Sequence, residues 1–241
     1  MKNATDQGTA IPAAYSKERR EIAPLLPGRF DSVLEIGCGS GSTMAWLRRT
    51  RAVEYAAGVE YAEAAASLAR PHFDDLEIGD AATTPMRFKR EHFDLVLALD
   101  VLEHIPYPET TVARLAERLK PGGTMVVSLP NIAHYHASVP LFLRGQWTYG
   151  RDGILDRTHL RFFSEAGARA LIEGSGLRIT SIRYNFHYPS PLSCFGVTNP
   201  KWLWASRRLA GLFLIWPKHL FKYQFLIAAT RPKERAREDG H

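Results

Sequence analysis

Cysteine is scarce in this chain, and its scarcity excludes two kinds of site. The two cysteines, Cys38 and Cys194, lie far apart and form no CxxC or Cys/His spacing, so neither a disulfide framework nor a zinc site is expected. The first 20 residues are polar and lack the apolar run of a signal peptide or an N-terminal anchor. We therefore expect a cytoplasmic protein.

Acidic residues are absent from the C-terminal quarter. No Asp or Glu lies between Gly174 and Lys233, a stretch that holds nine basic residues. The whole chain has 31 Lys and Arg, 25 Asp and Glu and a net charge of +6, so 22 basic residues and a charge of −3 are left for the remainder. All of the positive excess therefore belongs to this quarter.

Long apolar runs are missing as well. The longest run of the basic quarter, residues 209–217, is far too short to cross a bilayer. Residues 201–222 combine tryptophans with cations, which suits an interfacial helix on a membrane or a helix packed over the sheet or against a second subunit of a homodimer. No RNA-binding motif accompanies the charge, so no nucleic acid partner is expected.

Short apolar strands and helical segments alternate along the 241 residues, which are 45% hydrophobic and so suffice for one sizeable core. The alternation predicts an α/β fold with a Rossmann-like, doubly wound, mostly parallel sheet of seven strands. Ser40 or Ser42 is expected to cap the first helix, and a capping box at Ser164 is expected to start the last. The expected strands are 33–36, 54–60, 75–80, 93–101, 124–130, 177–185 and 221–232, and the expected helices are 42–49, 62–70, 109–119 and 164–176.

We expect a single domain over residues 1–232 with two insertions. Residues 131–160, after the fifth strand, are loop-like and predict an acceptor-site insertion. Residues 186–220, after the sixth strand, predict a basic aromatic insertion. The charged tail 233–241 is expected to be mobile.

The first strand stops at a glycine-rich loop in the sequence VLEIGCGSGSTM, residues 33–44. Gly37, Gly39 and Gly41 let a ligand approach the backbone closely, and the next helix offers its N-terminal amides. The dinucleotide pattern GxGxxG is not met, nor is the Lys-Ser/Thr pair of a P-loop present. Glu35 would repel a phosphate but suits a cation, which favours S-adenosylmethionine (SAM), a ligand with an ammonium, a sulfonium and no phosphate.

Residues 33–130 resemble the class I SAM-dependent methyltransferases, whose first strand and loop have the pattern E/D-x-G-x-G-x-G that EIGCGSG matches. The resemblance implies that Glu60 binds the ribose hydroxyls and that Asp80 with Ala81 contacts the adenine. Alternatively, Glu60 and Asp80 are ordinary strand-end acids that cap the next helix. The further cofactor contacts expected from the resemblance are Cys38, Tyr61, Asp100 and Tyr15.

Tyr15 precedes the first strand, where this family often has a helix over the cofactor. Arg19 and Arg20 lie in the same segment. As an alternative to cofactor contact, all three residues belong to a solvated helix face.

Transfer of a methyl group to an oxygen needs the acceptor hydroxyl to lose its proton, for which a neutral imidazole is well suited. His104, in DVLEHIP, directly follows the fourth strand and is the first candidate base. His159, in DRTHLRFF, is the second, and Asp156 is placed to orient an imidazole or contact a hydroxyl. Alternatively, His104 only caps and packs a turn.

The pattern D-x-x-E-H, formed by Asp100, Glu103 and His104, is similar to the ExxEH of ubiquinone-pathway O-methyltransferases, where such groups are associated with a divalent metal. The first position departs from that pattern, because Asp replaces Glu. We therefore expect no metal site and keep a divalent metal as the less favoured alternative.

The segment 128–164 resembles the acceptor region of bacterial methyltransferases that accompany glycosyltransferases in cell-surface polysaccharide pathways. Tyr135 and Tyr149 are expected to face sugar rings, while His134 and Arg157 would bind hydroxyls or an acidic group. In the structural alternative, Arg157 pairs with Asp156 inside an ordered loop.

These observations predict a SAM-dependent O-methyltransferase that releases S-adenosylhomocysteine. Its expected acceptor is a hydroxyl of a sugar, a glycan or a lipid-linked glycan in surface polysaccharide biosynthesis, with membrane contact through 201–222. Two alternatives stay open: O-methylation of a quinone-type or other lipophilic small molecule, and a SAM-binding domain that scaffolds neighbouring glycosyltransferases.

Overall fold

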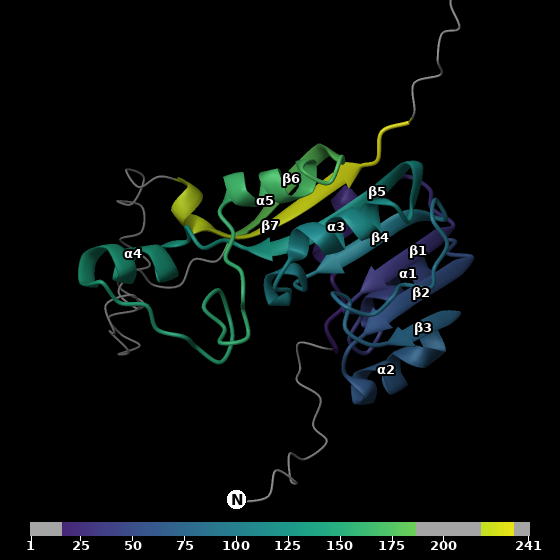
Figure 1. Ribbon diagram of the computed structural model, residues 1–241, viewed down its shortest axis with the longest axis horizontal. Coiled ribbons are helices and arrows are strands. Elements are labelled where there is room, and N and C mark those ends of the chain that lie inside the picture. The colour runs from purple at the N-terminus through teal and green to yellow at the C-terminus, as the bar shows by residue number, and fades with distance from the viewer. Residues whose placement is uncertain (1–15, 187–217, 234–241) are drawn as a thin grey trace, which may run out of the picture.

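The computed structural model describes residues 16–186 and 218–233, which contain one seven-stranded sheet (Figure 1). The strand order is β3-β2-β1-β4-β5-β7-β6. Strands β1 to β5 run parallel, and β7 lies antiparallel to both of its neighbours, as a mostly parallel α/β sheet requires. The strands are β1 (Ser32–Ile36), β2 (Tyr55–Glu60), β3 (Asp75–Ile78), β4 (Phe93–Leu99), β5 (Leu119–Pro130), β6 (Arg178–Phe186) and β7 (Lys222–Thr230).

Several predicted features lie outside the described residues. They are Tyr15, Cys194, residues 187–217, which make up most of the 186–220 insertion and of the 201–222 segment, and residues 234–241 of the tail. Within residues 16–186 and 218–233, no helix has the length and apolar character needed to span a bilayer.

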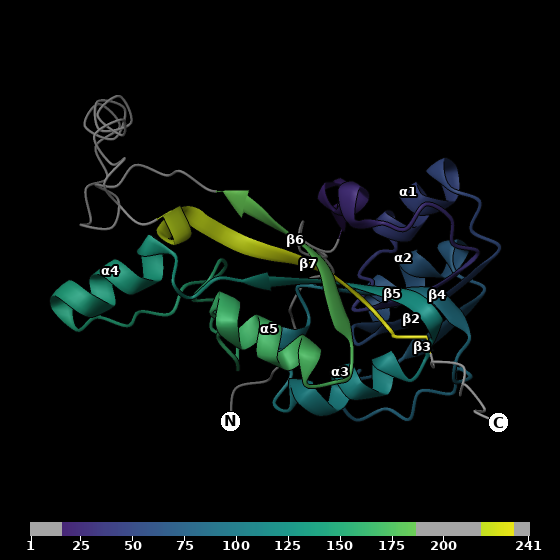
Figure 2. The same cartoon turned by 90° about the horizontal axis from the view of Figure 1, so that it is seen from above.

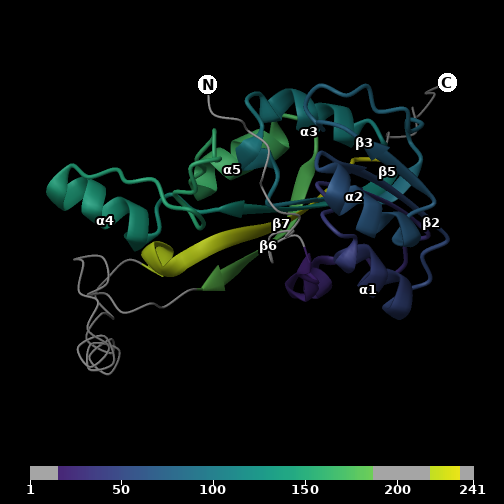
Figure 3. The same cartoon turned by 90° about the horizontal axis from the view of Figure 1, so that it is seen from below.

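The helices cover both faces of the sheet, as Figures 2 and 3 show. One apolar core lies between the sheet and α3 and α5, and the other between the sheet, α1 and a 3-10 helix over Arg20–Leu25. Strand β1 is buried along its whole length because it is covered on both sides. The helices are α1 (Ser42–Thr50), α2 (Glu63–Ala69), α3 (Pro108–Ala116), α4 (Tyr135–Arg144) and α5 (Glu165–Glu173).

Two helix caps differ from the expectation. The N-cap of α1 is Gly41 in a left-handed conformation, and the hydroxyls of Ser40 and Ser42 bond to each other instead. At α5, the Ser164 hydroxyl accepts from the amide of Gly167. The capping box is only half formed, because a glycine at this position has no side chain to return the bond.

The predicted loop 131–160 contains a helix, so that part of the prediction is wrong. Helix α4 begins after the N-cap His134 and ends at Gly145, which has a left-handed backbone. Pro140 lies inside the helix, and the two buried residues, Tyr135 and Ala137, stand near its start. An internal proline is normally a signal against a helix, which explains why the segment was expected to be a loop.

The boundaries of two predicted elements can be compared with the structure: the helix expected over 62–70 is α2, and the strand expected over 124–130 is the second part of β5. The chain passes through Pro71 in a 3-10 turn over Arg70–His72 directly after α2. The turn at 121–123 is a bulge within β5, where the pairing shifts from Phe93 with Leu119 to Leu95 with Thr124.

Candidate functional site

The glycine loop lies between β1 and α1 and has the backbone that only glycine adopts readily. Gly37, Gly39 and Gly41 all have positive φ angles, between 56° and 76°. A Cβ on Gly37 would lie 2.3 Å from a methyl group of Val101, and one on Gly41 would lie 3.1 Å from the backbone of Ala69. The loop is thus pressed against its neighbours and cannot accommodate side chains.

Two buried carboxylates flank this loop. Glu60, at the end of β2, accepts hydrogen bonds from the amides of Gly39 (2.8 Å) and Ala62 (2.9 Å). Glu35, in β1, is buried, and its Oε2 atom has no hydrogen-bond partner. Burial and the nearby Glu60 raise the pKa of Glu35 to about 8, although the charge of Arg19 opposes this rise. A buried carboxylate without a partner is costly, and the ammonium or sulfonium of SAM is a cation that would satisfy it.

The remaining predicted cofactor residues surround the same end of the sheet. Asp80 follows β3, and its Oδ1 accepts from the amide of Ala82 at 2.8 Å within a turn. Strand β4 is the next element, so the alternative that Asp80 caps a following helix is wrong. Ala81 is buried, while Tyr61, next to Glu60, is 78% exposed. Cys38 is buried in the glycine loop, where burial raises the pKa of its thiol.

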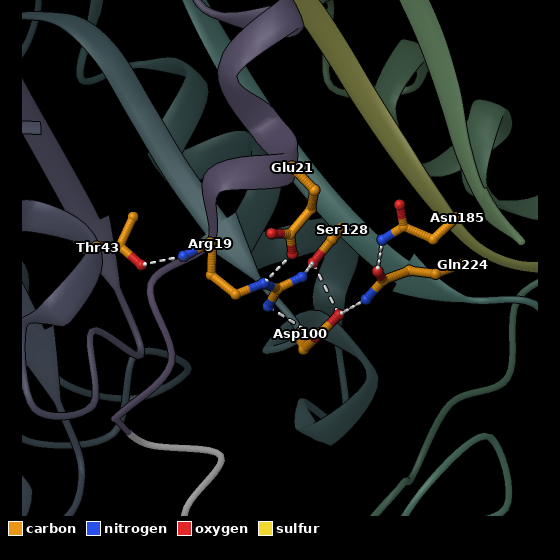
Figure 4. Close-up of polar contacts among 7 residues, drawn as sticks. All are labelled: Arg19, Glu21, Thr43, Asp100, Ser128, Asn185 and Gln224. Atoms are coloured by element: carbon orange, nitrogen blue, oxygen red, sulfur yellow. Dashed lines mark hydrogen bonds and ion pairs between the residues drawn. The ribbon is translucent and has the colours of Figure 1, made fainter. Parts of the chain in front are cut away.

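A polar network crosses the carboxyl ends of the strands (Figure 4). The Arg19 guanidinium donates to Asp100 (2.8 Å) and to Ser128 (3.2 Å), and its side chain is only 12% exposed. Asp100 also accepts from Ser128 and from Gln224 on β7. Asp100 has a positive φ of 56°, an uncommon backbone for a residue that is not glycine.

The network corrects the interpretation of Arg19 as part of a solvated helix face. Sequence analysis missed this ion pair because Arg19 and Asp100 are far apart in the chain, and no local pattern links them. The backbone amide of Arg19 also donates to the Thr43 hydroxyl in the first turn of α1 (3.3 Å), so the N-terminal segment is attached to the cofactor end of the sheet.

The two predicted bases, His104 and His159, lie together beyond the end of β4. Their rings pack edge to face with centroids 4.8 Å apart. Each Nδ1 atom faces a backbone carbonyl, that of Thr158 for His104 (3.2 Å) and that of Ile154 for His159 (2.9 Å). Because a carbonyl only accepts, each Nδ1 carries the proton and each Nε2 keeps a lone pair.

The environment of His159 favours its neutral form. Its pKa is lowered by burial and by the nearby His104. Asp156 accepts from the backbone amide and the hydroxyl of Thr158, both at 2.7 Å, so the bonds of Asp156 go to Thr158 rather than to an imidazole. Burial would raise the pKa of Asp156, but the bonds from Thr158 hold it below its usual range.

Glu103 completes a cluster with the two histidines. Among the described residues, Glu103, His104 and His159 form the one group of three whose ligand atoms lie within 4.8 Å of one another. Glu103 is 1% exposed, its Oε2 has no partner, and burial raises its pKa well above the usual range. Two imidazole nitrogens and a carboxylate fit a divalent cation, whereas Asp100, the first residue of D-x-x-E-H, is not part of this group.

The four predicted acceptor residues divide into two pairs. His134 and Tyr135 are buried at the start of α4, where the His134 ring lies 5.3 Å from that of Tyr223. Tyr149 is half exposed, and Arg157 is exposed and donates to the carbonyl of Gly150. The structural alternative for Arg157 was an ion pair with Asp156. Arg157 instead donates to the backbone carbonyl of Gly150.

A family model described as "Methyltransferase domain" matches residues 9–182. The chain is also similar to proteins named "Ubiquinone biosynthesis O-methyltransferase". It is 32% identical to the protein of that name from Azoarcus sp., over 50% of this chain and 56% of the relative. It is 36% identical to the one from Nitrosococcus oceani, over 41% of this chain and 43% of the relative. The chain thus spans about half the length of the relatives that it matches.

Solved structures share the fold. A SAM-dependent methyltransferase from Archaeoglobus fulgidus superposes with a TM-score of 0.60 at 18% identity, covering 92% of this chain and 94% of that one. A SAM-dependent methyltransferase from Mesorhizobium loti superposes with a TM-score of 0.59 at 19% identity, covering 89% of this chain and 97% of that one. The family match, the strand arrangement and the glycine loop between two buried acids agree: the chain belongs to the methyltransferase domain family, within the class I SAM-dependent methyltransferases.

Proposed function

We propose that the chain transfers the methyl group of SAM to a hydroxyl of a quinone-type or other lipophilic aromatic acceptor. The observation that carries the proposal is the position of two groups at one edge of the sheet. The carboxylates Glu35 and Glu60 flank the glycine loop after β1, and the imidazoles of His104 and His159 follow β4, the strand beside β1. A donor held by the carboxylates would therefore lie close to the bases.

The acceptor class is inferred from the relatives, which bear the name of quinone-pathway O-methyltransferases. These names favour the alternative that the sequence left open over the sugar or glycan acceptor that it preferred. The polysaccharide prediction receives no support from these relatives. A phenolic hydroxyl also suits the site chemically, because it ionises near pH 10 and gives up its proton to an imidazole more readily than a sugar hydroxyl does.

In the proposed reaction, a neutral imidazole accepts the proton of the acceptor hydroxyl as its oxygen attacks the methyl carbon. The C–S bond of SAM breaks, and the electron pair stays on sulfur in S-adenosylhomocysteine. His159 is buried with its Nδ1 fixed on Ile154, while His104 lies nearer to solvent. His159 is therefore assigned as the base, and His104 would pass the proton to water.

Glu103, His104 and His159 would hold a divalent metal if the enzyme uses one. Such an ion would lower the pKa of a bound acceptor hydroxyl.

The test has two stages. Calorimetry with SAM and with S-adenosylhomocysteine measures cofactor binding. Catechols, hydroxylated quinols and nucleotide sugars are then incubated with the chain and SAM. The masses of the products are measured to detect the gain of one methyl group. Methylation of the phenolic compounds is expected. Methylation of the sugars alone would overturn the acceptor assignment, and a lack of SAM binding would overturn the whole proposal.

A further inference from the structure

Residues 150–159 carry the proposed base, and hydrogen bonds within this loop close it; we call it the base loop. The amide of Gly150 donates to the carbonyl of Leu155 at 2.8 Å. The Nδ1 atom of His159 lies 2.9 Å from the carbonyl oxygen of Ile154 in the same loop. The loop therefore fixes the orientation of the His159 ring, whereas the position of the ring at the site depends on what holds the loop as a whole.

The base loop contacts the turn after β4 and strand β7. Just after its end, the amide of Leu160 donates to the Glu103 carbonyl at 2.8 Å, which attaches the loop to that turn. In its middle, a Cβ on Gly153 would lie 3.2 Å from the hydroxyl oxygen of Tyr223. Within residues 16–186 and 218–233, no other atom outside the adjacent residues lies within 4 Å of that position. The Tyr223 hydroxyl therefore lies against the loop at a point that has no side chain.

Tyr223 is itself fixed to the sheet. It lies on β7, and its carbonyl accepts from the amide of Asn131 at 2.9 Å. Its ring packs edge to face on the buried ring of His134, with centroids 5.3 Å apart. The next residue, Gln224, donates to Asp100 in the network of Figure 4. The phenol therefore extends from a strand of the sheet, beside the polar network, to the base loop.

The hydroxyl of Tyr223 carries no charge at neutral pH. Burial raises the pKa of the phenol, and the negative charges of Asp100 and Asp152 add to this rise. The hydroxyl thus keeps its proton and meets the glycine as a neutral group of fixed size.

We propose that Tyr223 is a positioning residue for the methyl transfer: its hydroxyl lies against Gly153 and sets how far the base loop, with His159, stands from the sheet. A general base must come within hydrogen-bond reach of the proton that it accepts. A misplacement of about 1 Å at a reacting group can cost about a hundredfold in rate. The inference rests on the proposed function, because it concerns the base that was assigned there.

Gly153→Ala tests the contact, and Gly176→Ala is its matched control. The two glycines have φ angles of 82° and 81°, so an alanine carries the same backbone strain at either position. A Cβ on Gly176, however, meets no atom within 4 Å among the described residues, whereas one on Gly153 presses on the Tyr223 hydroxyl. Gly153→Ala is therefore expected to lower kcat about fivefold with a phenolic acceptor and to leave the KM for SAM unchanged. Gly176→Ala is expected to change neither.

A second substitution, Tyr223→Phe, removes the hydroxyl and keeps the ring on His134. On its own it is expected to lower kcat less than Gly153→Ala does. In the double variant Gly153→Ala/Tyr223→Phe the added methyl group no longer meets the oxygen, so kcat is expected to rise above that of Gly153→Ala. Coupling of this kind occurs between residues in contact and not between independent ones. Losses that multiply in the double variant would overturn the proposal.

The position of His159 can also be measured without turnover. The NMR signal of its ring, assigned by its loss in His159→Ala, is recorded in the cofactor-free chain at one alkaline pH; it depends on the ring of His104, whose centroid lies 4.8 Å away. The signal is expected to move in Gly153→Ala, to return in the double variant and to stay in place in Gly176→Ala. An equal shift in both alanine variants, or none in either, would contradict the positioning role. If the signal moves as expected but no acceptor is methylated, the positioning by Tyr223 stands and the proposed function fails.

Discussion

The imidazoles of His104 and His159 pack edge to face, and each donates its Nδ1 proton to a backbone carbonyl. Two lone pairs therefore lie side by side at the end of β4. In the single variants His104→Ala and His159→Ala, the remaining imidazole is expected to preserve part of the turnover. The double variant is expected to lose about a hundredfold or more in kcat, the usual size of a general-base contribution. Steady-state kinetics at saturating SAM measure this, and full activity of the double variant would exclude both bases.

The raised pKa of Glu35 predicts that SAM binding depends on pH. Burial raises the pKa of this carboxyl to about 8, with Arg19 opposing and Glu60 adding to the rise. Below pH 8 the carboxyl must therefore lose a proton to bind a cation. The affinity for SAM is expected to rise by up to about tenfold per pH unit towards pH 8 and then level off. Calorimetry across pH 6–9 measures the slope, which Glu35→Gln is expected to abolish.

The same pKa predicts the stability of the cofactor-free chain. In the unfolded chain Glu35 would ionise near the ordinary glutamate pKa of 4.5, whereas the folded chain keeps the proton up to about pH 8. The contribution of Glu35 to the free energy of unfolding is therefore fully present below pH 4.5 and is lost as the pH rises towards 8. Glu35→Gln is expected to raise the melting temperature at pH 8 relative to the unsubstituted chain. A lower melting temperature would contradict the burial argument.

The cluster around Glu103 predicts binding of a divalent ion. Cobalt(II) titration is expected to give a visible absorption spectrum that Glu103→Gln weakens, because the buried Oε2 has no other partner. Chelation is expected to lower turnover without abolishing it, since loss of the ion frees the Nε2 lone pairs of the two imidazoles to accept a proton. Asp100→Asn is the control, because Asp100 is engaged with Arg19 and is expected to leave the cobalt spectrum unchanged.

The ion pair between Arg19 and Asp100 predicts that the N-terminal segment supports the cofactor site. Arg19→Ala removes bonds to Asp100 and Ser128 and is expected to cost about 2 kcal/mol of unfolding free energy, typical of hydrogen bonds to charged groups. Arg20→Ala, which removes an exposed pair with Glu18, is expected to cost less than about 1 kcal/mol. Urea unfolding compares the two, and equal costs would contradict a structural role for Arg19.

The glycine loop and its acids could be predicted from the sequence because a strand, a turn and a strand-end acid are local features. The alternation of strands with helices also predicted a mostly parallel sheet of seven strands, whereas the order of the strands became visible only in the fold. The bond of Arg19 to Asp100 and the approach of His159 to His104 could not be predicted, because both join distant segments through the tertiary fold. Helix α4 escaped prediction for a different reason: Pro140 lies inside it, and an internal proline normally argues against a helix.

The close approach of Gly37 to Val101 has a consequence for kinetics. Val101 precedes the turn that carries Glu103 and His104, so a Cβ on Gly37 would push the loop on the methyl-donor side against the turn on the acceptor side. Gly37→Ala should therefore raise the KM values of donor and acceptor together, while Gly28→Ala, which meets no atom within 4 Å, should change neither. The contact between Gly37 and a methyl group of Val101 thus joins the two sides of the proposed site, and a larger side chain at either residue would alter both halves of the proposed reaction at once.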